Sequence, residues 1–102
     1  SIFLLPPSLK ELWHRLERRG SDDLATRWRR INNARAELQR GHLFHHFVVN
    51  EELASAYAEL VAIAVQKTPP KLDRKRGINL INQILNEFEH APWYKELLSK
   101  FR

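Results

Sequence analysis

The stretch from Ser8 to Gly20 reads SLKELWHRLERRG, and it decides the fold class of the chain. Its first four residues have the form of a capping box, in which the Ser8 hydroxyl and the Glu11 carboxylate satisfy unpaired backbone amides at a helix start. Gly20 is typical of the position just beyond a helix end. The stretch therefore predicts an amphipathic helix, whose apolar residues recur at helical spacing: Leu9, Leu12, Trp13 and Leu16.

Similar start and stop signals predict a second and a third helix. The second begins after Ser21-Asp22-Asp23, because short polar and acidic side chains suit the exposed amides of a helix start, and it ends at Gly41. The third follows Asn50 and ends before Pro69-Pro70, since proline cannot donate an amide hydrogen bond. Its expected inward stripe contains Leu53, Ala56, Tyr57, Leu60, Val61 and Ala64.

Two more helices are expected after the loop of residues 67–77. The fourth has an inward set that begins with Ile78 and ends with Phe88, and Pro92 stands at a favourable first position for the fifth. Helices this short are marginal alone and have to bury their apolar faces against one another. The sequence therefore predicts an all-α fold, a compact bundle of about five short helices in mainly antiparallel arrangement.

Two short apolar segments lie outside these helices. Residues 42–49 read HLFHHFVV, a run compatible with a buried connector or with one short strand, and we interpret it as a packed linker. Phe3, Leu4 and Leu5 precede Pro6-Pro7 and can fold back on the bundle or extend as an arm. Folding back is the expected arrangement, because it removes three apolar side chains from water.

Length and composition favour one folded domain over residues 1–102. Hydrophobic residues make up 43% and charged residues 28%, an ordinary globular mixture. The first residue is not methionine, which suggests a domain cut from a longer protein. The chain has no cysteine, which excludes disulfides and thiolate chemistry. No apolar stretch approaches the roughly 20 residues of a membrane span. We expect an intracellular location, in the cytoplasm or nucleus, and no contact with membrane.

The histidines raise the possibility of a metal site. His42, His45 and His46 lie near Glu51 and Glu52, and a Glu-x-x-His pattern occurs at residues 87–90. A zinc site needs three or four converging ligands, and a di-iron bundle needs two such patterns plus further glutamates. Solvated or helix-capping histidines are the preferred interpretation, so we expect neither metal nor cofactor.

Arg40 is followed five residues later by His45. This spacing resembles the R-x4-H motif of the HEPN ribonucleases, a family of small helical bundles. The resemblance covers six residues and implies cleavage of an RNA phosphodiester, with the histidine as general acid or base and the arginine neutralising phosphate. HEPN proteins usually have a polar residue after the arginine, where this chain has Gly41. The alternative is that Arg40 ends a helix and His45 lies in a linker.

Basic side chains dominate both ends of the sequence, which has a formal charge of +5. Arg74, Lys75 and Arg76 enter the start of a helix, where the helix dipole disfavours cations, so local stability does not explain their placement. An anion near the exposed amides would explain it. If the second helix lies close to this loop, the predicted anion or nucleic-acid site comprises Arg27, Arg30, Lys71, Arg74, Lys75 and Arg76. A wider basic surface adds Arg15, Arg18, Arg19, Arg29, Arg35 and Lys67.

No glycine-rich phosphate loop, nucleophile elbow or zinc-finger spacing is present. The leading hypothesis is therefore a non-enzymatic helical interaction module that binds a partner protein, either as a helix or peptide in a groove or as a second copy of itself. The first alternative is a basic domain that binds RNA or DNA phosphates. The second alternative is an RNA-cleaving enzyme built on Arg40 and His45.

Overall fold

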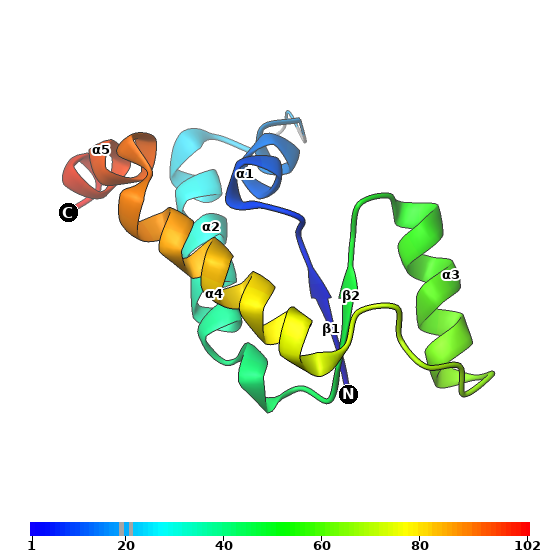
Figure 1. Cartoon of the computed structure of the whole chain (residues 1–102). Helices are drawn as coiled ribbons and strands as arrows, with labels where there is room; N and C mark the ends of the chain where they lie inside the picture. Colours follow the sequence, from blue (N-terminus) through cyan, green and yellow to red (C-terminus); the bar gives the residue numbers. More distant parts are fainter. Residues whose placement is uncertain (19, 21) are drawn as a thin grey trace.

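The computed structural model of the protein describes residues 1–18, 20 and 22–102, and the side chain of Leu53 is not among the described parts (Figure 1). Arg19 and Ser21, which belong to the predicted basic surface and helix start, lie outside the described residues. The described residues form, in chain order, β1 (Ile2–Leu5), α1 (Leu9–Arg18), α2 (Leu24–Gln39), the 3-10 turn η1 (Gly41–Leu43), β2 (His46–Val49), α3 (Leu53–Ala64), α4 (Arg74–His90) and α5 (Pro92–Lys100).

The prediction of a mostly helical fold with five helices is confirmed for the described residues. The Ser8 hydroxyl accepts the amide of Glu11 at 3.0 Å, which is one half of the predicted capping box. Asp23 caps α2 through the amide of Thr26 at 2.8 Å. Gly20 has a φ of 71°, the left-handed conformation that glycine adopts readily after a helix. Local signals in the sequence thus fixed where these helices begin and end.

The structure differs from the all-helical expectation in a small parallel sheet. β1 pairs with β2 in a register that sets Ile2 opposite His46 and Leu5 opposite Val49. The interpretation of residues 42–49 as a packed linker is therefore wrong, since half of this segment is a strand. The folding back of residues 3–5 is confirmed, and it takes the form of strand pairing at the centre of the molecule (Figure 1).

The sheet also shifts the start of α3. The amide of Asn50 donates to the Leu5 carbonyl at 2.7 Å and so continues the sheet pairing, instead of leaving Asn50 as the helix cap. Glu52 occupies the cap position without a side-chain hydrogen bond. Tyr57, expected on the inward stripe, is 67% exposed. α3 therefore buries a narrower face than its sequence pattern predicts.

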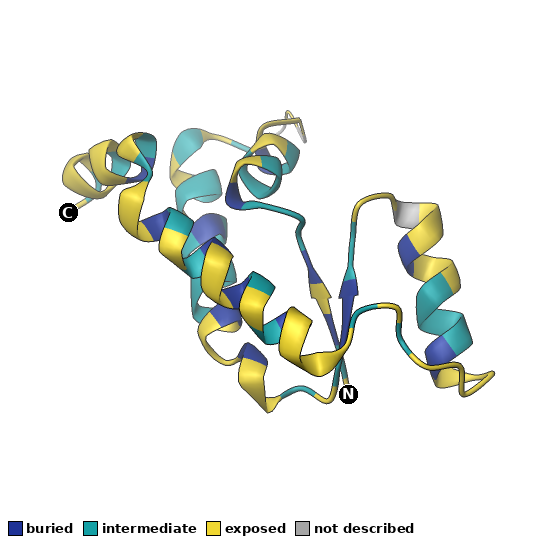
Figure 2. Cartoon of the chain, viewed as in Figure 1, coloured by how far each residue is buried: buried dark blue, intermediate teal, exposed yellow. Residues whose placement is uncertain are grey.

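The core has two parts (Figure 2). In the main cluster, Phe47 of β2 and Phe88 of α4 are fully buried among residues of β1, α1 and α2. The second cluster is small and lies beneath α3, where Val48 meets Ala56 and Ile63. The three tryptophans are half-buried and pack against the main cluster, as their helical spacing predicts. None of the helices described is both long and apolar enough for a membrane span.

Two glycines are required by close packing. Gly77, expected in the loop before α4, lies inside that helix, and a Cβ there would meet the Phe47 ring at 2.5 Å. A Cβ on Gly41 would meet the end of the Ile81 side chain at 2.4 Å. Each glycine therefore lets α4 approach a neighbouring segment.

Candidate anion-binding site at the strand ends

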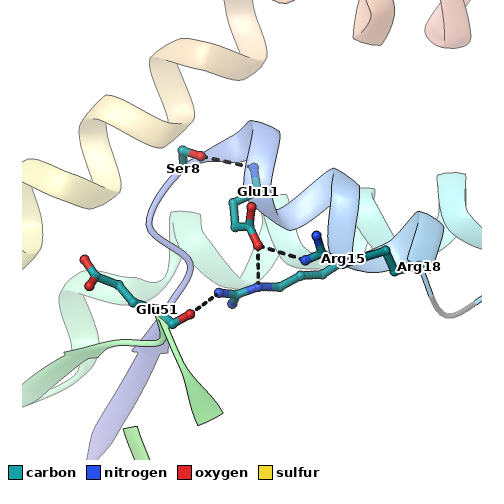
Figure 3. Close-up of polar contacts among 5 residues, drawn as sticks. All are labelled: Ser8, Glu11, Arg15, Arg18 and Glu51. Carbon is teal, nitrogen blue, oxygen red and sulfur yellow. Dashed lines mark hydrogen bonds and ion pairs between the residues drawn. The ribbon is translucent and has the colours of Figure 1, made fainter. Parts of the chain in front are cut away.

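The candidate site lies where the two parallel strands end. β1 leads into α1 through residues 6–8, and β2 leads into α3 through residues 50–52. In open sheets built from parallel strands, ligands bind outside the carboxyl ends of the strands. Arg15 of α1 crosses this region, and its Nη2 donates to the Glu51 carbonyl at 3.1 Å (Figure 3). One guanidinium therefore joins α1 to the loop that follows β2.

Glu11 holds two arginines of α1 on the same side. Its Oε1 accepts from Nε of Arg15 at 3.2 Å and from Nη2 of Arg18 at 2.9 Å (Figure 3). The hydrogen bond from Arg18, followed by that from Arg15, lowers the pKa of Glu11 below its ordinary value of 4.5. The Glu11 carboxylate therefore stands where an incoming anion would meet both guanidinium groups. Among the described residues, the Glu11 carboxylate pairs with these arginines and accepts no amide at the helix start, so the second half of the predicted capping box is not formed.

A second pair of arginines lies near the start of α2. The Arg27 guanidinium carbon lies 5.5 Å from the centre of the Trp13 ring, and its Nη1 lies 4.0 Å from Oε2 of Glu17. Arg30 pairs with Asp22 at 3.3 Å. The Nε of Arg27 is buried and has no hydrogen-bond partner among the described residues. α1 and α2, which we call the arginine hairpin, thus present four arginines, Arg15, Arg18, Arg27 and Arg30, that each have an acidic neighbour.

The loop before α4 lies elsewhere. Arg74 donates to the His42 carbonyl at 2.5 Å, and Asp73 caps α4 through the amide of Arg76 at 2.8 Å. These contacts explain part of the basic run by local structure, without an anion. Lys71 and Arg76 line a cleft of 440 Å³ together with Val49, Glu51, Glu52, Ser55, Glu59 and Leu72. Acidic groups share that cleft, so its charge is mixed.

The six predicted site residues do not come together. Arg27 and Arg30 lie at the end of α2 that packs near α5, where Trp28 stacks on Phe101. Arg74 contacts η1 at the opposite end of α4, a helix of 17 residues and hence about 25 Å long. The C-terminal end of α2 does lie near the basic loop, through η1, but Arg27 and Arg30 lie toward the other end of α2. Anion binding stays a prediction, and it now applies separately to the pair on α2 and to the four residues of the loop before α4.

The histidines do not converge. Within the described part of the chain, no group of three or more histidine, aspartate or glutamate side chains could hold a metal ion. Nδ1 of His45 lies 3.3 Å from both the amino group and the hydroxyl of Ser1, and Nδ1 of His90 lies 2.9 Å from the carbonyl of Asn86. Arg40 is exposed, and no hydrogen bond between it and His45 occurs among the described residues.

The geometry singles out Arg15 and Arg18, which sequence reasoning placed in the wider basic surface but not in the predicted site. Both fall in the last turn of α1, where cations suit the helix dipole, so local helix stability is enough to account for their presence in the sequence. What the sequence could not show is that the loop after β2 reaches α1. The parallel pairing of β1 with β2 places the loop after β2, and with it Glu51, beside Arg15.

Parallel strands followed by helices, with arginines gathered beyond the strand ends, define a class of site suited to phosphate groups. Comparison with known proteins specifies this class further. The chain is 45% identical over 67 residues to a guanylate kinase of Nitratidesulfovibrio vulgaris, which covers 66% of the chain and 32% of that relative. It is 48% identical over 67 residues to the guanylate kinase of Oleidesulfovibrio alaskensis, again 66% of the chain and 32% of the relative.

A third guanylate kinase, from Mesorhizobium japonicum, is 39% identical over 88 residues, which are 85% of the chain and 40% of that protein. The chain thus spans between about a third and two fifths of the length of these curated relatives. No family model matches the chain. No solved structure matches it either.

These similarities overturn the leading functional hypothesis. A non-enzymatic interaction module is contradicted, because the curated relatives at 35 to 48% identity are kinases and therefore enzymes. The first alternative, a basic domain that binds RNA or DNA, is not supported by these relatives either. The ribonuclease hypothesis finds no relative among these proteins. Sequence reasoning went wrong by treating the absence of a phosphate loop from this chain as the absence of an enzyme.

Proposed function

We propose that the chain is part of a guanylate kinase, in which the arginine hairpin binds phosphate groups during phosphoryl transfer to a guanylate such as GMP. The observation that carries the proposal is the position of Arg15, whose guanidinium bridges Glu11 and the Glu51 carbonyl beyond the ends of both strands. The similarity to guanylate kinases supplies the substrate class.

The chemistry of phosphoryl transfer suits this arrangement. Negative charge spreads over the oxygens of the transferred group, so catalysis rests mainly on positioning and on electrostatic stabilisation. An arginine offers a planar set of donors that matches phosphate geometry, and its charge does not titrate near neutral pH. Arg15 is only 26% exposed, which keeps its guanidinium in a defined position before any ligand arrives.

The sheet supports a role within a larger protein. Sheets made only of parallel strands occur almost exclusively where both faces are covered, and they usually contain more than two strands. Here β1 has β2 as its partner on one side, and no pairing on its other side involves described residues. The sequence contains no glycine-rich phosphate loop. Under this proposal, the rest of a larger protein supplies that loop and the additional strands. The chain then packs against that part of the protein.

A chimaeric enzyme tests the proposal. The segment of the Nitratidesulfovibrio vulgaris guanylate kinase that matches this chain is replaced by the chain, and transfer of phosphate from ATP to GMP is measured. We expect the chimaera to be active, and Arg15→Ala to lower kcat by about 100-fold or more, the loss typical of removing a donor that acts on transition-state charge. Arg102→Ala, which removes an exposed arginine at the chain end, is the matched control and should retain activity.

Two results would count against the proposal. A folded chimaera without activity would show that the chain cannot serve in a guanylate kinase. An active chimaera in which Arg15→Ala behaves like Arg102→Ala would remove the arginine hairpin from the reaction. An intracellular location accompanies the proposal, because nucleoside monophosphates are substrates found inside cells.

A further inference from the structure

Three side chains from three helices form a stack beside the arginine hairpin. The Arg27 guanidinium lies over the Trp13 ring at 5.5 Å, and Trp13 in turn stacks on Trp93 of α5, with ring centres 4.8 Å apart and planes inclined by 23°. Arg27 is 23% exposed, and its Nε is buried. The indole of Trp13 therefore contacts both a cation of α2 and an aromatic ring of α5.

The rest of α5 is fixed firmly enough to hold that ring in place. The hydroxyl of Tyr94 donates to Oδ1 of Asn32 and lies 3.3 Å from Nη1 of Arg35, and the Tyr94 side chain is buried. Farther along, Phe101 stacks on Trp28 with ring centres 5.8 Å apart. These contacts tie α5 to the middle and the start of α2. Trp93 is consequently presented to Trp13 by an anchored helix.

The end of α4 fixes α1 in a similar way. Oε2 of Glu87 accepts the amide of Leu9 at 2.7 Å, a hydrogen bond between residues 78 positions apart in sequence. It satisfies one of the amides that a helix start leaves without an internal partner. Both helices of the arginine hairpin thus contact the C-terminal part of the chain. α1 is held at its first residue and at Trp13. α2 is held at Asn32 and Trp28.

We propose that Trp93 is a positioning residue for Arg27 and acts through Trp13, so that α5 sets the geometry of a cation in the arginine hairpin. The inference rests on the proposed function for its ligand, a phosphate group, but not for the stack itself. A cation held over an indole loses freedom to reorient, and the contact contributes most where water is partly excluded. Without Trp93, one face of Trp13 opens to solvent and the ring can turn away from Arg27.

The first experiment measures the position of Arg27 in the full chain. Exchange of the Arg27 Nε proton with water is followed by nitrogen-15 NMR, and Arg27→Lys identifies the resonance by removing it. In Trp93→Leu we expect exchange to accelerate by about fivefold, the equivalent of one cation–π contact of ~1 kcal/mol. Trp93→Phe, which retains an aromatic ring, should restore most of the protection.

Phe101→Leu is the matched control, because it also removes an aromatic ring from the α5 region but contacts Trp28 instead of Trp13. It should leave Arg27 exchange at the native rate even where overall stability falls. Unchanged exchange in Trp93→Leu would overturn the proposal. So would equal acceleration in Phe101→Leu, because the effect would then be a general loss of stability.

The second experiment measures binding of inorganic tripolyphosphate to the full chain at low ionic strength by calorimetry. Affinity should fall by about two- to fivefold in Trp93→Leu and stay unchanged in Phe101→Leu. No binding by the native chain, or unchanged affinity in Trp93→Leu, would overturn the role of the stack in anion binding. An inactive chimaera combined with the expected results for Arg27 would instead reject only the guanylate kinase function.

Discussion

At the scale of single residues, Gly77 gives the sharpest prediction about stability. Alanine is the better helix former, but a Cβ at this position would overlap the Phe47 ring and also lie 2.9 Å from its Cβ. Both atoms belong to a fully buried side chain with no room to move. We expect Gly77→Ala to lower the free energy of unfolding by about 1–3 kcal/mol, the usual cost of overpacking. Urea denaturation of the native chain and of Gly77→Ala measures this difference in the free energy of unfolding.

Gly41→Ala serves as the comparison. The atom that its Cβ would meet is Cδ1 of Ile81, the far end of a flexible side chain, which can rotate away. We expect a loss of about 1 kcal/mol or less, because only a rotamer has to change. Equal losses in the two variants would mean that α4 shifts as a whole to accommodate the Cβ of Gly77→Ala.

Glu11 gives a prediction about pH at the same scale. Its pKa in the folded chain is lowered, chiefly by the hydrogen bond from Arg18. A carboxylate with a lowered folded pKa stabilises the fold above its unfolded value of 4.5, and the contribution disappears as pH falls through the folded pKa. The stability difference between the native chain and Glu11→Gln should therefore shrink as pH is lowered from about 6 to about 3. A constant difference in thermal melts over this range would contradict the pairing.

At the scale of elements, α3 stands apart from the other helices. Its described buried residues belong to the small cluster around Val48 and Ile2, whereas α1, α2 and α4 share the main core. A helix with few buried apolar contacts opens locally at a lower free energy than the global unfolding. We expect native-state hydrogen exchange to show lower protection for the amides of α3 than for those of α4. Equal protection in the two helices would show that α3 unfolds only with the whole chain.

Also at this scale, the sequence was sufficient to predict that five helices exist, but it was insufficient for the strands and for the starts of α3 and α4. Ser8, Asp23 and Pro92 mark helix starts through contacts within a few residues, so their signals are complete in the local sequence. The strands are four residues each, and residues paired across the sheet are 44 positions apart. Pairing at that distance leaves no local pattern except two short apolar runs, which fit a buried connector equally well.

At the scale of the whole molecule, contacts between distant parts of the sequence were again not predictable, and this explains why the six predicted site residues do not come together. Charge counts showed that both ends of the chain are basic, and this pattern suggested one shared surface. The topology separates them, because α4 runs from the sheet to α5 and carries the basic loop away from Arg27 and Arg30 (Figure 1). The arginines at the strand ends became recognisable only once β1 and β2 were seen to be parallel. The sequence did not indicate an enzyme, because the chain spans a minor part of the length of the kinases that it matches.

The tryptophan stack also has an optical consequence. All three tryptophans of the chain lie where α5 meets the arginine hairpin, and α3 carries none. Intrinsic tryptophan fluorescence therefore reports on that half of the molecule and does not detect the unfolding of α3. A melting curve followed by emission would show one transition even if α3 had already opened, whereas far-ultraviolet circular dichroism would register both events. Coincidence of the two curves is thus the condition for treating the chain as a two-state folder.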